Sequence, residues 1–512
     1  MSQPDARPTA RPAVSHSAFA LAFLAAAVFA LTSRYPGYVH HDTAEIAMWS
    51  TLPWPLGLPK HPPLLPWLFR AYSTIVALNW ISIGVLAAAN IALGAWAVWQ
   101  IALLVLDERR AALAALLYGL APAGTFFALK LNHNGILVSL WPLTILAFFA
   151  CLRAESTARS IATGIAFGAL AASGMLAKYY TGVLLASCIL AWLASTERVR
   201  FLLRPGGYVA VGTFALLVAP HVLWMLNEGN GKTLEYALHA TESEARPISH
   251  FLAFTPVYLL PPVAGFLLLR RWLGSAPHQQ PAKARPEILV LSIAPFLLTA
   301  LLITVFKLHG STTWSLPDFC VVPVLLAAAL AVPSDAALAR LKRGAAATLA
   351  VVALSGPIVL AIAFRLADPN AVEPRYEAAL AGARIFTAAT GRPVAFVAGD
   401  PQSANSAALA IPSHPRVFNA FDAGSTPWAT PELIARDGLL VICRPNTGCD
   451  QQVDDVVRKR QSFHGVIFKQ RHWLGMAGPI QSFTVTIVPP QGAVVDAARI
   501  DDAWRAGGSQ QP

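Results

Sequence analysis

Long runs of apolar residues, separated by short polar segments, follow one another through the first two thirds of the chain. Each run is roughly 16 to 24 residues, close to the length a helix needs to cross about 30 Å of hydrocarbon. A water-soluble helical protein is the alternative, but uncharged runs this long are rare in soluble cores. The pattern predicts eleven membrane spans, at about 18–33, 83–106, 111–129, 135–152, 161–177, 180–195, 208–226, 251–269, 288–306, 319–333 and 344–364.

Lys and Arg are distributed unequally between the polar segments. With the N-terminus in the cytoplasm, the inside segments carry about twice as many of them as the outside segments, as the positive-inside rule expects. An odd number of spans then places the chain after residue 365 outside. The first span is short enough to be a cleaved signal peptide instead of an anchor, and cleavage would leave the later topology unchanged.

Two segments expected outside are long, residues 34–82 and 227–250. The first is rich in Trp, which suits the headgroup layer, and in Pro. Its prolines exclude a regular helix through residues 53–63. The apolar content from Leu64 to about Val76 predicts a helix that lies along the membrane surface.

Beyond residue 365 the pattern changes to short strand-like and helix-like segments. Strands are predicted at "PVAFVAG", "RVFNAF", "LLVIC", "GVIFKQR" and "FTVTIV", and helices at "SANSAALAI", "ATPELIARDG" and "DDVVRKR". In the second helix Thr430 is a cap, Pro431 fits the first position and Gly438 the end. The alternation predicts a small α/β domain over residues 367–512, after a membrane domain over residues 1–366, and leaves antiparallel pairing of its last strands open.

Composition supports the membrane assignment. The 512 residues are 55% hydrophobic and 13% charged, with a mean hydropathy of +0.53. The net charge of +11 is spread over small cytoplasmic loops, which indicates anchoring to anionic lipid and no nucleic-acid partner. Cys443 and Cys449 lie in the outside tail, where an oxidising compartment permits a disulfide, although two free thiols are an open alternative.

Charged residues are concentrated immediately outside the first span, in "HHDTAEIAMWS". Asp42 and Glu45 are three residues apart, so a helix would place both carboxylates on one side. Lys60 and His61 follow in "KHPPL". A carboxylate can act as a general base toward a hydroxyl, and an ammonium can neutralise a departing phosphate. A solvated loop without function is the alternative.

Further polar clusters, "KLNHNG", "AKYYTG" and "FKLHGSTTW", fall on the same expected face as Asp42. The spans themselves contain a single ionisable residue, His221, beside Pro220. Its membrane depth makes it a functional candidate, and a hydrogen bond to a neighbouring helix is the alternative explanation. Ion-coupled transporters keep ionisable groups at the midplane, so the rim location argues against transport.

The segments "HHDTAEIAMWS…LPKHPPLLPWL", "KLNHNGILVSLWPLT", "GMLAKYYTGVLL" and "APHVLWMLNEGNGKTLEYA" together resemble bacterial family-39-type and family-83-type glycosyltransferases of the GT-C class. These enzymes are related to protein O-mannosyltransferases and to lipid A aminoarabinose and galacturonic acid transferases. The resemblance covers about residues 30–320. It implies a polytopic α-helical membrane protein of about eleven transmembrane helices with the GT-C fold, carrying a C-terminal periplasmic α/β domain.

The resemblance also implies roles for residues. It places Asp42 as catalytic base or metal-contacting carboxylate, Glu45 as the adjacent acid and Lys60 opposite the lipid phosphate. Lys178, Arg246 and Lys307 are further candidates for the phosphate. Candidates for contacts with substrate are His61, Asn132, His133, Asn134, Tyr179 and His309.

Metal dependence is left open by the motifs. Many relatives carry an aspartate where this chain has Asn132-His133-Asn134, so a two-aspartate metal site is not expected. A divalent metal, if used, would be held by Asp42 and His133. A hydrogen-bonding role at a helix end is an equal alternative for His133 and Asn134.

The function expected from this resemblance is transfer of a hexosyl or pentosyl group, with inversion, from a polyprenyl-phosphate donor to a hydroxyl acceptor on lipid, glycan or protein. The active site would face the periplasm, in a bacterial inner membrane. Two alternatives are an oligosaccharide ligase or polymerase that uses a polyprenyl diphosphate, and a lipid-linked-sugar flippase. A flippase needs a polar path through the membrane, which the predicted spans do not offer.

Overall fold

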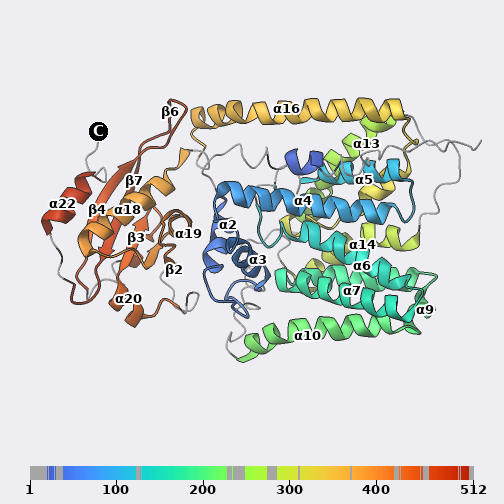
Figure 1. Ribbon diagram of the computed structural model, residues 1–512, viewed down its shortest axis with the longest axis horizontal. Helices are drawn as coiled ribbons and strands as arrows, with labels where there is room; N and C mark the ends of the chain where they lie inside the picture. Colours follow the sequence, from blue (N-terminus) through green and yellow to red (C-terminus); the bar gives the residue numbers. More distant parts are fainter. Residues whose placement is uncertain are drawn as a thin grey trace, which may run out of the picture.

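The computed structural model describes residues 20, 22–27, 29, 39–122, 127, 130–227, 233, 248–273, 285–308, 312–368, 372–419, 426, 428–449, 451–453, 460–493, 495 and 497–506. Figure 1 shows two parts side by side, a bundle of helices and a smaller part that contains a sheet. The helices α2 (His41–Trp49) and α3 (Leu64–Ser73) lie between them.

The bundle, called the membrane region below, contains most of the apolar helices. Among the described residues, six are long and apolar enough to cross a membrane, and two shorter ones are also apolar. Its elements are α4 (Trp80–Ala102), α5 (Glu108–Gly119), α6 (Leu137–Leu152), α7 (Thr157–Ala177), α8 (Thr181–Ala194), α9 (Arg198–Leu202), α10 (Pro205–Asn227), α12 (Ile248–Phe254), η2 (Thr255–Leu259), α13 (Leu260–Leu273), α14 (Pro286–Phe306), η3 (Thr312–Ser315), α15 (Val322–Ala328) and α16 (Asp335–Arg365).

These helices overlap every predicted span from the second onward, and the first span lies largely outside the described residues. Three predicted lengths differ from the structure. In the run predicted at 111–129, helix α5 ends at Gly119. The apolar run at 319–333 forms only the short helix α15, because turns take up the residues before it. The last helix, α16, extends to 31 residues, since its polar first turns continue the helix from the capping residue Ser334.

Small residues allow two of the spans to pack closely. In α7, a Cβ atom at Gly164 would lie 2.4 Å from the carbonyl oxygen of Gly206, and one at Gly168 would lie 2.3 Å from the carbonyl oxygen of Ala210 in α10. Backbones approach this closely only where no side chain intervenes. These glycines therefore allow α10, which carries His221, to pack directly against α7.

The chain between α2 and α3 follows the prediction from its prolines. No helix forms over residues 51–63, and α3 begins at Leu64. Arg70 in α3 donates to the carbonyl oxygens of Ser50 and Leu52, at 3.2 and 3.1 Å. These bonds fix α3 against the end of α2.

The sheet-containing part, called the C-terminal region below, has the α/β character predicted for it. Strands β2 (Arg416–Asn419), β1 (Phe396–Gly399), β3 (Leu439–Cys443), β7 (Gln481–Val488) and β4 (Phe463–Lys469) form one sheet in that order. The first two pairs are parallel, and β7 is antiparallel to both β3 and β4. The pairing left open for the last strands is thus antiparallel.

Helices α18 (Arg375–Thr390), α19 (Pro401–Ala410), α20 (Pro431–Asp437) and α22 (Ala497–Ala506) accompany the sheet, and β5 (His472–Trp473) and β6 (Met476–Ala477) form a hairpin. The predicted cap is confirmed, because Thr430 accepts from the backbone N–H of Leu433 and the helix ends at Gly438. Cys443 and Cys449 form a disulfide. The sequence "DDVVRKR" falls mostly outside the described residues.

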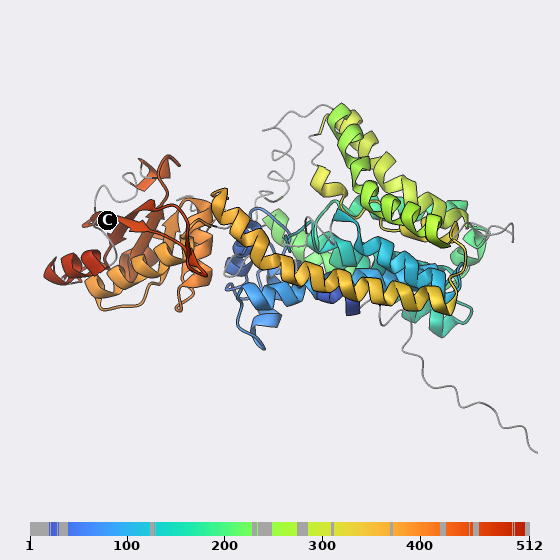
Figure 2. The same ribbon diagram turned by 90° about the horizontal axis from the view of Figure 1, so that it is seen from above.

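Two contacts join the regions. Helix α19 packs on α2, and Met48, Trp49 and Leu52 belong to the same buried cluster as Ala404 and Ala407 of α19. At the other side, the hairpin packs on the end of α16, the helix that runs along the membrane region toward the C-terminal region in Figure 2. The helix that carries Asp42 is therefore supported from both regions.

Candidate active site at the outer rim

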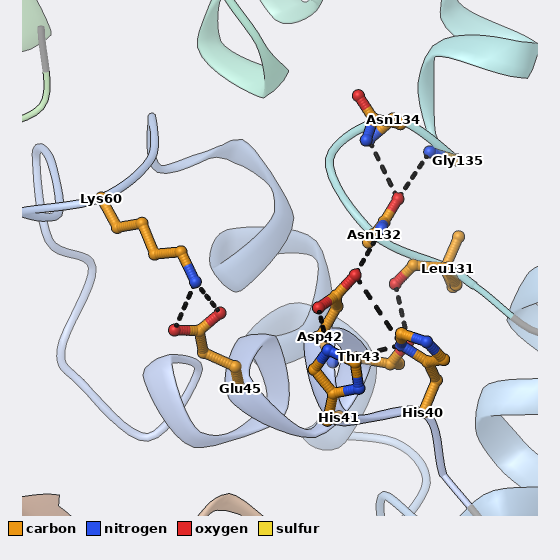
Figure 3. Close-up of polar contacts among 10 residues, drawn as sticks. All are labelled: His40, His41, Asp42, Thr43, Glu45, Lys60, Leu131, Asn132, Asn134 and Gly135. Atoms are coloured by element: carbon orange, nitrogen blue, oxygen red, sulfur yellow. Dashed lines mark hydrogen bonds and ion pairs between the residues drawn. The ribbon is translucent and has the colours of Figure 1, made fainter. Parts of the chain in front are cut away.

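The N-terminus of α2 presents Asp42 to a ring of polar partners (Figure 3). His41 Nε2 lies 2.9 Å from Asp42 Oδ1, and Asn132 Nδ2 donates to Asp42 Oδ2 at 2.9 Å. His40 Nδ1 accepts from the backbone N–H of Asp42 at 3.2 Å and so caps the helix. The carboxylate is held in place while each oxygen keeps a lone pair for another donor.

Asn132 owes its orientation to a backbone turn. Its Oδ1 accepts from the N–H groups of Asn134 and Gly135, at 3.0 and 2.9 Å. With Oδ1 occupied in this way, the amide can direct only its Nδ2 at Asp42. The loop "KLNHNG" therefore donates to the carboxylate from the opposite side to α2.

These contacts decide the charge of Asp42. Burial raises the pKa of Asp42. The hydrogen bonds from His41 and Asn132 and the neighbouring His40 lower it by more, so the pKa lies well below its usual range. The side chain remains 34% exposed. Asp42 is thus an ionised carboxylate at neutral pH that a substrate can reach.

Glu45 is on the same helix but has a different environment. Its two oxygens accept from Lys60 Nζ at 3.1 and 3.0 Å, and its side chain is only 11% exposed. The two carboxylates that the spacing predicts on one side of a helix therefore meet different partners. Of the pair, Asp42 is the accessible one.

Lys178, at the end of α7, reaches the loop that carries Asn132 and Asn134. Its Nζ donates to Asn134 Oδ1 and lies 5.3 Å from the centre of the Trp314 ring. Burial lowers the pKa of Lys178 to about 7, and the charge of Asp42 opposes that shift. Two amides, Asn132 and Asn134, thus stand between the carboxylate of Asp42 and the ammonium of Lys178.

The rings of His61 and His133 lie against each other, between Lys60 and Lys178. Their centres lie 4.1 Å apart, and His133 Nδ1 donates to the carbonyl oxygen of Ala177 at 2.9 Å. Burial and the charges of the two lysines lower the pKa of both rings, that of His133 to about 3. Both are neutral, and His133 Nε2 is a buried acceptor without a partner among the described residues.

The structure therefore brings together eight of the predicted site residues, Asp42, Glu45, Lys60, His61, Asn132, His133, Asn134 and Lys178. Tyr179 turns away, and its hydroxyl lies 2.7 Å from His221 Nε2. Lys307 is exposed at the end of α14, and no contact between described residues joins it to the site. Arg246 and His309 lie outside the described residues.

His221 is hydrogen-bonded on both ring nitrogens, but its partners lie in loops and not in the neighbouring helix expected as the alternative. Its Nδ1 lies 2.7 Å from the carbonyl oxygen of Leu56, in the proline-rich loop, and Nε2 meets Tyr179. Both ring nitrogens are thus occupied. The residue ties α10 to the loop that carries Lys60.

The arrangement of possible metal ligands differs from the expectation. Within the described residues, the group that could hold a metal is His40, His41 and Asp42, whose ligand atoms lie within 4.8 Å of one another. His133 is not part of this group, although its Nε2 has no partner among the described residues; its Nδ1 donates to Ala177. The sequence contains the adjacent His40 and His41, but their adjacency does not tell whether they bind a metal or cap the helix.

One buried acid was not predicted. Tyr180 donates to Asp318 Oδ1 at 2.8 Å, and Asp318 is fully buried with Oδ2 unpartnered among the described residues. Burial raises the pKa of Asp318 to about 7. Tyr180 also stacks on Trp141, 5.4 Å between centres. An acid at the outer end of an expected span was the available signal.

Comparison with known proteins identifies the class of the molecule. Residues 60–224 match the family model of dolichyl-phosphate-mannose-protein mannosyltransferases. The structure resembles ArnT from Cupriavidus metallidurans bound to undecaprenyl phosphate, with a TM-score of 0.61 at 13% identity, covering 93% of this chain and 98% of the other. The chain is a membrane glycosyltransferase with the GT-C fold. The apo form of the same ArnT gives 0.58 at 14% identity, with coverages of 91% and 97%.

The two comparisons support different statements. The structural likeness establishes the fold over nearly the whole chain, C-terminal region included. The family match begins at Lys60 and contains both the second loop and Lys178, but it leaves Asp42 and Glu45 outside. No curated protein sequence matches the chain. The resemblance inferred from the motifs is thus confirmed for the class, and the roles of individual residues stay predictions.

Proposed function

We propose that this glycosyltransferase moves a sugar from a polyprenyl-phosphate donor to a hydroxyl group at the outer face of the membrane. The observation that carries the proposal is the accessible, ionised Asp42, held by histidine and amide partners beside two lysines, at the end of a membrane bundle. The similar ArnT structure has undecaprenyl phosphate bound. A donor with a prenyl tail in the bilayer requires a site at this level.

In this proposal Asp42 is the general base. An acceptor hydroxyl would donate to a free lone pair of Asp42 and attack the anomeric carbon from the face opposite the departing phosphate, which inverts the configuration. A carboxylate with a lowered pKa is a weak base, so it takes the proton late, as the bond to the sugar forms. Its constant ionisation keeps it ready to accept at every physiological pH.

Lys60 and Lys178 receive the negative charge that develops on the leaving phosphate. Lys60 is 32% exposed and lies on the Glu45 side of the site. Lys178 is half-buried, and within the described part of the chain it donates to the neutral amide of Asn134. A preorganised cation in a site of low dielectric stabilises developing charge more strongly than one in water. Glu45 positions Lys60 in this scheme.

A divalent metal is compatible with the site but is not needed for this scheme. Two imidazoles and a carboxylate form a donor set suited to zinc or a similar ion, and His40, His41 and Asp42 would supply it. Such an ion would act as a Lewis acid beside the phosphate. His40 already uses Nδ1 to cap α2, so the ion would compete with that bond.

We further place the enzyme in a bacterial inner membrane with its N-terminus inside, and divide it into domains 1–366 and 367–512. The distribution of Lys and Arg supports this orientation. Reporter fusions after Arg110 and after Pro374 should report opposite compartments. Equal signals from the two fusions would contradict the orientation without affecting the chemistry.

A donor screen with the purified enzyme tests the function. Undecaprenyl-phosphate sugars should be consumed with release of undecaprenyl phosphate, and Asp42→Asn in the same detergent should not release it. Release of a polyprenyl diphosphate would favour the ligase or polymerase alternative. Movement of the lipid-linked sugar across vesicles without release would favour the flippase.

A further inference from the structure

A cavity lies at the junction of the two regions, separate from the residues around Asp42. Its volume is about 260 Å³, and its walls come from the start of α4, the first turn of α18, the end of α19 and the segment between β4 and β5. The lining residues are Leu78, Asn79, Trp80, Tyr376, Glu377, Leu409, Ala410 and Arg471. The walls of the cavity thus combine apolar and charged side chains.

The cavity lies at the level of the membrane surface. Trp80 is the first residue of α4, a predicted span that follows directly on the outer loop, and Trp at a span end is typical of the headgroup layer. On the other side, Arg471 precedes the hairpin that packs on the last turns of α16. The ends of two spans therefore bracket the cavity.

Exposed aliphatic side chains continue from both walls. Ile75, three residues before the lining residue Leu78, is 82% exposed, and Leu474 at the tip of the hairpin is 77% exposed. Leu366, directly after α16, is 75% exposed. Aliphatic side chains so exposed beside span ends are suited to acyl chains and not to water.

Positive charge exceeds negative charge around the cavity. Arg471 and Glu377 line it, and Lys469 and Arg384 act electrostatically on the same cluster. Burial lowers the pKa of both Arg471 and Lys469, and Glu377 opposes the shift in each case. Within the described part of the chain, these three cations surround one carboxylate, and an anionic group would offset their excess charge.

We propose that this cavity binds the phosphate-bearing headgroup of an anionic membrane lipid, with the acyl chains against the exposed aliphatic residues. The bound lipid would bridge the membrane region and the C-terminal region. The last residues of α19 line the cavity, and α19 also packs on α2, the helix that carries Asp42. A bound lipid would therefore stabilise the position of α2. The proposal concerns lipid binding and stands apart from the sugar chemistry.

Native mass spectrometry of the full-length enzyme in detergent tests the proposal, with phosphatidylglycerol as the probe. We expect Arg471→Gln to weaken phosphatidylglycerol binding on the order of fivefold, since one cation near a membrane surface contributes about that much. Glu377→Gln should strengthen binding by a similar factor. Arg436→Gln is the matched control, because that side chain is exposed and paired with Asp437 on α20.

Three outcomes decide between the possible ligands. Selective binding of phosphatidylglycerol over phosphatidylcholine, lost in Arg471→Gln, supports the proposal. Binding of inorganic phosphate with the same dependence on Arg471, and no preference for the lipid, would replace the lipid by a free anion and overturn it. Equal retention of phosphatidylglycerol by Arg471→Gln and Arg436→Gln would also overturn it. The opposite sign expected for Glu377→Gln guards against a simple loss of folding.

Discussion

The active site and the C-terminal region both hold charged side chains partly or fully away from water, but the partners of those charges differ. In the C-terminal region, Arg444 contacts Asp400 at 2.9 Å and Glu373 at 3.2 Å, and Arg375 also pairs with Glu373. Each buried carboxylate there meets a guanidinium directly. Two positive and two negative groups satisfy one another, so the network holds the ends of β1 and β3 together.

At the outer rim, Glu45 and Lys60 also pair directly, but Asp42 and Lys178 are kept apart by the amides of Asn132 and Asn134. Asp42 contacts histidines and the Asn132 amide, and Lys178 contacts the Asn134 amide. Direct pairing would neutralise both charges and lower their value toward a substrate. The comparison teaches that the carboxylates paired with arginine in the C-terminal region serve the fold, whereas Asp42 and Lys178, which do not pair with each other, remain available for chemistry.

The largest effect is expected from removing a charge in the C-terminal network. Arg444→Met should lower the free energy of unfolding of the C-terminal region by about 3 kcal/mol, because Glu373 and Asp400 stay buried after losing a partner. Thermal unfolding or limited proteolysis would measure it. Arg436→Met, at an exposed pair, should change stability little. Equal stability of the two variants would show that the network is not structural.

Asp42→Asn tests the other side of the comparison. The amide keeps the size and hydrogen bonding of the carboxylate but cannot take a proton, so turnover should fall by about 100-fold or more. Donor binding should persist, because the lysines are unchanged. Asp335→Asn, an exposed acid at the start of α16, is the matched control. A correctly inserted Asp42→Asn enzyme with most of its turnover would return His40 to Glu45 to the status of an ordinary loop.

The disulfide should contribute less than the charge network it adjoins. Cys443 and Cys449 enclose a short loop directly after β3, and closing such a loop stabilises by about 2 kcal/mol. The double variant Cys443→Ser, Cys449→Ser should therefore unfold more readily, with turnover below the transition unchanged. Non-reduced peptide mass spectrometry checks the bond itself. Alkylation of both thiols without reductant would contradict it.

The smallest effect concerns pH. With a pKa of about 7, Lys178 is charged below neutrality and loses its proton as the pH rises through 7. Turnover should fall over that range if the ammonium stabilises the phosphate. Lys178→Arg keeps the charge, so its basic limb should move to higher pH, whereas Lys307→Arg, at an exposed position, should not move it. Identical basic limbs in Lys178→Arg and the parent enzyme would remove Lys178 from the step.

Local patterns in the sequence were sufficient for the elements of the fold. Apolar runs located the spans from the second onward, and Thr430, Pro431 and Gly438 marked both ends of α20. These features depend on residues close in the chain, through hydrophobic length and capping. The spacing of Asp42 and Glu45 was compatible with a helix, but it did not by itself predict α2.

Tertiary structure decided how the polar residues were paired. The sequence named Asp42, Asn132 and Lys178, but only the approach of three loops far apart in the chain placed two amides between the charges. The packing also brings Glu45 to Lys60 and Tyr179 to His221. It places α2 against α19. A residue type and its spacing specify which contacts are chemically possible. Which of them form depends on distances that the packed bundle alone determines.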